Sequence, residues 1–135
     1  MRVLIILLFI PFIGFSQAPN QFKYQSIARD LAGSVLNTVP IGLRISVRDL
    51  SPTGTIVFQE THSLTTNQFG LFTLSIGGGT PVTGTIALVD WGNGAKYVEI
   101  EADLSGGTAY DPFGTTELLS VPYAIYANTA GIPIL

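Results

Sequence analysis

Hydrophobic and polar residues alternate with a period of two along several stretches of this chain. The clearest stretch is residues 41–49, in which every second side chain is apolar: Ile41, Leu43, Ile45 and Val47. Glycine, arginine and serine fill the positions between them. Because successive side chains of a strand point to opposite faces, this pattern predicts a strand with one buried face.

The same pattern predicts seven or eight short strands along the chain. Besides residues 41–49, the expected strands cover residues 22–29, 35–39, 55–65, 71–77, 86–89, 95–103 and 115–121. Turn residues separate them, and Asn93-Gly94 is the dipeptide most typical of a two-residue hairpin. Strands do not alternate with helices, which disfavours a parallel sheet. We therefore predict an all-β fold, an antiparallel β-sandwich of the immunoglobulin-like or prealbumin-like kind.

The N-terminal residues have the layout of a secretory signal peptide. Arg2 precedes an apolar run over residues 3–13, and small residues follow for cleavage after Ser16 or Ala18. A membrane anchor is the alternative, but a spanning helix needs about 20 apolar residues. We predict a signal peptide over residues 1–16, a sandwich domain over 17–121 and a C-terminal tail, helical or extended, over 122–135.

Composition narrows the classes of partner. Cleavage after Ser16 leaves 119 of the 135 residues, with five basic and nine acidic side chains and no cysteine. Such a chain has no basic stripe for phosphate backbones, so nucleic-acid binding is not expected. No membrane span is expected after cleavage, and the localisation expected is secreted or cell-surface.

Residues suited to catalysis are few. His62 is the only histidine, and Glu99, Glu101 and Asp103 fall on one side of an expected strand, where we interpret them as its solvent face. Residues 76–84 contain glycines but lack the Gly-Lys-Ser/Thr of a phosphate loop. We therefore predict no enzymatic activity, no cofactor and no metal site.

Aromatic residues are the remaining candidates for ligand binding. Trp91, Tyr97 and Tyr110 lie in or beside expected loops, near carboxylates, as in carbohydrate-binding modules. The alternative is that they pack against the sheet ends.

Four blocks of sequence carry a resemblance to a known group of proteins. They are FKYQSIARD, TTNQFGLFTLSIG, WGNGAKYVEIEAD and LLSVPYAIYA, in that order, and the match covers about Phe22 to Ala130. The set resembles the N-terminal module of secreted surface and fibre-like proteins of Bacteroidetes-type bacteria. The resemblance implies a module without catalysis, followed by a longer stalk; this chain, which has no such region, is expected to be a short or truncated member.

The tail changes its spacing after Pro122. Tyr123, Ala124, Ala127 and Ala130 recur at helical intervals, which predicts the first turns of a helix. With the stalk that the resemblance implies, these residues are expected to form the assembly seam of a homo-oligomer, a trimer. The alternative is that Ile125, Ile132 and Ile134 fold back onto the sandwich. The function expected is a secreted structural or adhesion module, the head or base of a surface or fibre-like assembly with a glycan or protein partner; the alternative is a carbohydrate-binding module.

Overall fold

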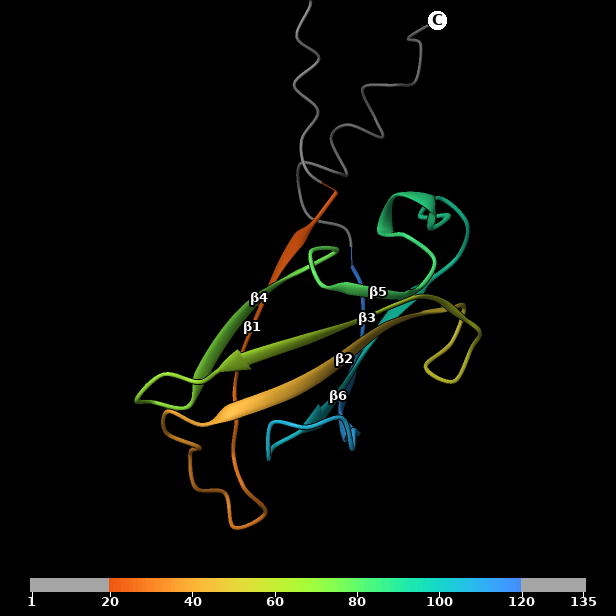
Figure 1. Ribbon diagram of the computed structural model, residues 1–135. Coiled ribbons are helices and arrows are strands. Elements are labelled where there is room, and N and C mark those ends of the chain that lie inside the picture. The colour runs from red at the N-terminus through yellow and green to blue at the C-terminus, as the bar shows by residue number, and fades with distance from the viewer. Residues whose placement is uncertain (1–19, 120–135) are drawn as a thin grey trace, which may run out of the picture.

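The computed structural model describes residues 20–119, which form two antiparallel β-sheets (Figure 1). The smaller sheet pairs β1 (Phe22–Ile27) with β4 (Leu71–Ile76). The larger sheet has the strand order β5-β3-β2-β6-β7. Its strands are β2 (Pro40–Asp49), β3 (Ile56–Thr65), β5 (Thr80–Thr83), β6 (Lys96–Asp103) and β7 (Asp111–Glu117). The prediction of an all-β antiparallel sandwich with seven or eight strands is confirmed.

The core lies between the two sheets and is centred on β2. Its four alternate apolar residues, predicted to face inward, are fully buried: Ile41, Leu43, Ile45 and Val47. Strands β3 and β6 flank β2 on both sides in long antiparallel registers. Phe72, Leu74 and Ile76 of β4 close the core from the smaller sheet. The period-two pattern therefore marks the residues that exclude water between the sheets.

Two predicted strands are absent from the structure. Residues 35–39 form no strand and contribute only an isolated bridge between Arg29 and Val35. Residues 86–89 contain a 3-10 helix, η1 (Ile86–Leu88), in which Ile86 and Val89 are buried and the two residues between them are exposed. That spacing of three residues fits a helical turn and not a strand.

The edge strands of the larger sheet were also misplaced. Strand β5 lies within the segment expected to be a glycine-rich loop, and β7 begins at Asp111 instead of residue 115. Both edge strands carry a proline beside a register shift, Pro81 in β5 and Pro112 in β7. Proline is found on sheet edges because it cannot donate a hydrogen bond to the ladder.

The predicted hairpin at Asn93-Gly94 is wrong. Gly94 has a φ of +76°, but the φ of Asn93 is not positive, and no strand directly precedes the turn. The loop is instead held by Lys96, whose side chain is 4 % exposed. Its Nζ donates to the carbonyl of Asn93 at 2.5 Å and lies 2.8 Å from Oδ1 of Asp49. A buried ammonium group thus organises this turn.

A buried carboxylate organises the connection between the two sheets. Glu60 of β3 is 1 % exposed. Its Oε1 accepts a hydrogen bond from the backbone N–H of Gly77 at 2.9 Å, and its Oε2 accepts one from that of Gly79 at 2.8 Å. Nε2 of His62 lies 2.8 Å from Oε1. Because the chain crosses from β4 to β5 here, Glu60 fixes the crossing between the sheets.

The glycines of this connection are required by the close approach. Gly77 has a φ of +96°, a conformation that side chains other than hydrogen disfavour. A Cβ atom on Gly79 would lie 2.5 Å from Nε2 of His62. The segment therefore serves to bring backbone N–H groups onto Glu60.

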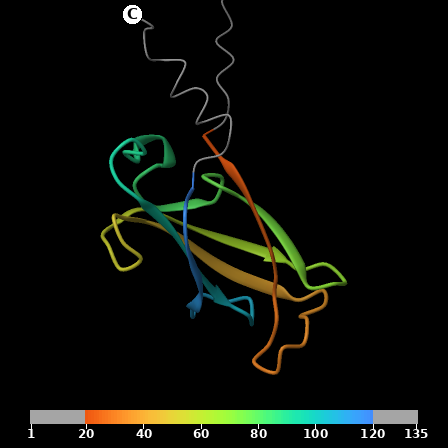
Figure 2. The same cartoon turned by 180° about the vertical axis from the view of Figure 1, so that it is seen from behind.

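Both connections to the rest of the chain leave from one end of the sandwich. Strand β1 begins, and β7 ends, at the end where η1 lies (Figures 1 and 2). The predicted signal peptide and the tail over residues 122–135 lie outside the described residues. Within residues 20–119, no helix is long and apolar enough to cross a membrane.

We expect the Glu60→Gln variant to lose about 1.5–3 kcal/mol of the free energy of unfolding, because the amide NH2 would face a backbone N–H in a buried site. Chemical denaturation at neutral pH measures this loss. Glu117→Gln is the matched control, since Glu117 is exposed and should change stability by less than about 0.5 kcal/mol. Equal stability of the two variants would contradict the role given to Glu60.

Candidate functional site

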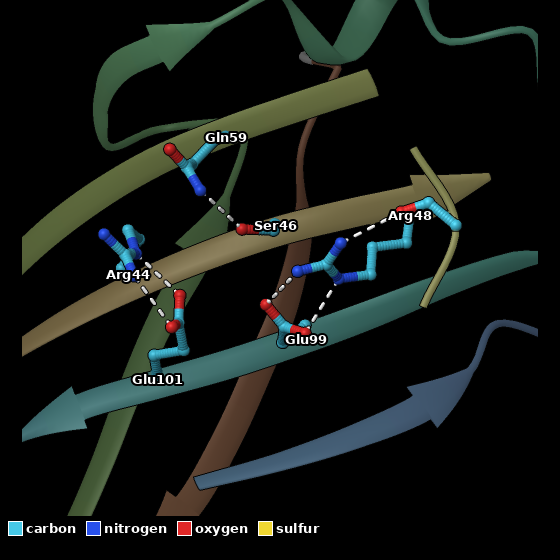
Figure 3. Close-up of polar contacts among 7 residues, drawn as sticks. Arg44, Ser46, Arg48, Gln59, Glu99 and Glu101 are labelled. Atoms are coloured by element: carbon cyan, nitrogen blue, oxygen red, sulfur yellow. Dashed lines mark hydrogen bonds and ion pairs between the residues drawn. The ribbon is translucent and has the colours of Figure 1, made fainter. Parts of the chain in front are cut away.

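The outer face of the larger sheet carries a row of paired charges (Figure 3). Arg44 of β2 donates from Nε and Nη2 to both carboxylate oxygens of Glu101 on β6, at 2.6 and 2.7 Å. Arg48 donates to both oxygens of Glu99, at 2.8 and 2.9 Å. Between the two arginines, Gln59 donates to the hydroxyl of the buried Ser46 at 2.9 Å.

Strand pairing produces this arrangement. Arg44 lies directly opposite Glu101 in the β2–β6 register, whereas Arg48 lies opposite Tyr97 and reaches diagonally to Glu99. These side chains occupy the positions between the buried apolar residues, so they emerge on the opposite face. Two-pronged arginine–carboxylate pairs are among the stronger ion pairs in proteins. The face is therefore ordered by its own charges.

The charges on this face neutralise one another. The hydrogen bond from Arg44 is the main cause that lowers the pKa of Glu101, and the same bond raises the pKa of Arg44. The bond to Glu99 likewise raises the pKa of Arg48. Acid–base catalysis by two carboxyl groups needs one of them held protonated near neutral pH. The lowered pKa of Glu101 is the opposite of that requirement.

Asp103, the third carboxylate of β6, closes a loop. Its Oδ1 accepts from the hydroxyl and the N–H of Ser105, and its Oδ2 accepts from the N–H of Ala109 at 2.9 Å. These bonds, led by that from the Ser105 hydroxyl, lower the pKa of Asp103. Within residues 20–119, no group of three or more histidine, cysteine or acidic side chains is placed to hold a metal ion.

Two of the three aromatic candidates lie on this outer face. Tyr110 covers Arg44, with the guanidinium carbon 4.9 Å from the ring centroid. Tyr97 lies opposite Arg48 in the register, on the same side of β6 as Glu99. Since Arg44 and Arg48 are four residues apart, the two tyrosines lie at the two ends of the charge row, roughly 13 Å apart along the strand direction.

Trp91 occupies a different place, at the end of the sandwich where β1 begins. Its Nε1 donates to the carbonyl of Ile86 at 3.1 Å, and its ring meets that of Phe22 edge to face at 6.5 Å. Asn20, Gln21 and Ala87 complete a cleft of about 270 Å³ beside it. Trp91 therefore shares no site with the pair Tyr97 and Tyr110 on the sheet face. The predicted seam residues Tyr123, Ala124, Ala127 and Ala130 lie outside the described residues.

A second hollow of about 570 Å³ lies at the opposite end of the sandwich, between residues 29–31 and the start of β7. Its side chains are already engaged: Asp30 accepts from the N–H groups of Ala32 and Ser34, and Arg29 donates to the carbonyl of Gly33. Asp103 is saturated by its own loop. This hollow offers few unused polar groups to a ligand.

Sequence reasoning missed the arginine partners and the role of Glu60. The sequence shows that Arg44 and Arg48 share one face of their strand, and that Glu99 and Glu101 share one face of theirs. Their pairing depends on β2 and β6 being neighbours, which no local signal encodes.

Comparison with known proteins identifies the family. A family model described as a domain of unknown function, DUF8740, matches residues 23–118, and the chain belongs to this family. No curated protein and no solved structure matches the chain.

We expect the free energy of unfolding to fall as the pH drops below about 4.5, the usual pKa of Glu101, and to fall further below 3.8, that of Asp103. A pKa lowered by folding adds stability above the unfolded value, and this stability is lost as the pH falls toward the folded value. Urea denaturation across this pH range measures the slope. Glu101→Gln should show a shallower slope, and a slope equal to that of the unchanged protein would contradict the assignment.

Proposed function

We propose that this member of the DUF8740 family is a non-catalytic structural or adhesion module, secreted through residues 1–16 and acting as the head or base of a surface or fibre-like assembly. The observation that carries the proposal is the pairing of charges on the outer sheet face. Both arginine–glutamate pairs are two-pronged, and Glu101 is held ionised by Arg44. Such a face suits a rigid contact surface better than it suits proton transfer.

The position of the chain ends supports the same function. Strands β1 and β7 connect to the rest of the chain at one end of the sandwich (Figure 2). A module attached at one end presents its opposite end and its sheet face to the surroundings. We place the assembly seam in Tyr123, Ala124, Ala127 and Ala130, just after the point where β7 leaves the sandwich.

We expect the chain from residue 17 to 135 to form a trimer that becomes a monomer when it is cut after Val121, because cutting removes the seam. Light scattering coupled to gel filtration measures both masses. Replacement of Ala124 and Ala127 by glutamate should have the same effect, since like charges would meet at the seam. A monomer before and after cutting would overturn the assembly part of the proposal.

A second candidate function is binding of an uncharged glycan on the outer sheet face. It is favoured by the placing of Tyr97 and Tyr110 at the two ends of a row in which two positive and two negative charges cancel. A neutral face with tyrosine rings suits a partner that lacks charge, since aromatic rings pack on apolar surfaces while hydroxyl groups form hydrogen bonds.

We expect the double variant Tyr97→Ala and Tyr110→Ala to lose binding to neutral polysaccharides in affinity gel electrophoresis, if this second function holds. Trp91→Phe is the control and should bind normally, because Trp91 lies at another site. Binding by neither the unchanged protein nor the variants would remove the glycan hypothesis and leave the structural one.

A further inference from the structure

We infer that the cleft beside Trp91 is covered by the chain's own residues 120–127, with Val121 and Ile125 as the side chains that pack against the indole. This goes beyond the proposed function, because it assigns an intramolecular contact that does not depend on assembly. It starts from the cleft, which is preformed, uncharged and lined mainly by apolar side chains.

The cleft is preformed because Trp91 is fixed on two sides. The hydrogen bond from Nε1 to the Ile86 carbonyl sets the direction of the indole, and the edge contact with Phe22 sets its tilt. The side chain nevertheless remains 44 % exposed. The indole N–H is already satisfied, so what the exposed ring offers is apolar surface.

The surroundings of the cleft favour an uncharged occupant, because they offer no ionic partner. None of its lining residues carries a charge: Asn20, Gln21, Phe22, Ile86, Ala87 and Trp91. At the same end of the sandwich, Leu88 is 84 % exposed and Leu119 is 78 % exposed. Exposed apolar groups gathered in one region mark a surface that a partner covers.

The chain itself supplies a suitable partner from Leu119 onward. Residues 120–135 contain no charged side chain. The backbone N–H of Leu118 donates to the carbonyl of Lys96 at 2.8 Å, and the ammonium of Lys96 holds the carbonyl of Asn93, two residues from Trp91. The chain therefore leaves the sandwich beside the loop that carries the indole.

Tethering strengthens a weak contact of this kind. A segment joined directly to its site has an effective concentration in the millimolar range, so a small apolar contact is enough to keep it bound. Residues four apart lie on one side of a helix. Val121 and Ile125 are four apart, and Ala127 and Ala130 fall on the opposite side of such a helix, so covering the cleft leaves that part of the proposed seam free.

The test uses Trp91, the only tryptophan of the chain, as an internal probe. The full chain from residue 17 to 135 is compared with the double variant Val121→Ser and Ile125→Ser and with the matched control Ala127→Ser and Ala130→Ser. Tryptophan emission and acrylamide quenching are recorded over a wide range of protein concentration. Circular dichroism and thermal melting show that each variant is folded.

We expect emission of the Val121→Ser and Ile125→Ser variant to shift to longer wavelength and its quenching constant to rise, at every concentration, with the control unchanged. A chain cut after Leu119 should behave like that variant, and a synthetic peptide of residues 120–127 should reverse the shift. Identical spectra for the full and cut chains would overturn the inference.

Two other outcomes would also overturn it by assigning the cleft elsewhere. If the protection of Trp91 from acrylamide disappears on dilution, the cleft is covered by a second copy of the chain. If Trp91 is protected only in chains that retain residues 1–16, the cleft is covered by the N-terminal segment. Failure of the trimer test affects mass alone, so the inference and the proposed assembly fail by separate measurements.

Discussion

The buried carboxylate of Glu60 is the contact that holds the two sheets in their relation to one another. It lies on the inner face of β3 and binds the backbone of the connection from β4 to β5, which is the point where the chain changes sheet. A buried carboxylate left without partners would be strongly unfavourable, so each state in which this connection detaches is penalised. Glu60 therefore acts together with the buried residues Phe72, Leu74 and Ile76 to hold β4 over the core.

Lys96, the first residue of β6, holds a loop in the complementary way. Glu60 gathers backbone N–H groups, whereas the ammonium of Lys96 gathers backbone carbonyls and the carboxylate of Asp49. Both side chains lie on the core face of the larger sheet among apolar neighbours. Each turns a glycine-containing segment into a fixed loop, and the loop held by Lys96 is the one that presents Trp91.

Charge is thus used in two different ways on the two faces of the larger sheet. On the inner face, Glu60 and Lys96 bind backbone groups and fix loops. On the outer face, arginines and glutamates bind one another and leave a neutral, ordered surface with tyrosines at its ends. The carboxylates on both faces are therefore engaged in contacts that hold the fold.

The sequence by itself determined which residues form the strands that have one face in the core and one face outside it. In β2 and β6 the alternation of apolar and polar residues decides which side chains enter the core, because the strand period is two whatever its neighbours are. The same pattern correctly placed Glu99 and Glu101 on the outer face.

Only the tertiary structure decided the rest. Residues 86–89 are a short apolar run whose period cannot distinguish a strand from a turn of helix, and Asn93-Gly94 forms a hairpin only where a strand precedes it. The ion pairs, and the hydrogen bonds from Gly77 and Gly79 to Glu60, join residues that are far apart in the sequence. The same holds for the separation of Trp91 from Tyr97 and Tyr110, which depends on where each segment lies in the fold. Such contacts depend on which strands become neighbours, and that choice is made by the packing of the whole sandwich, not by any local stretch.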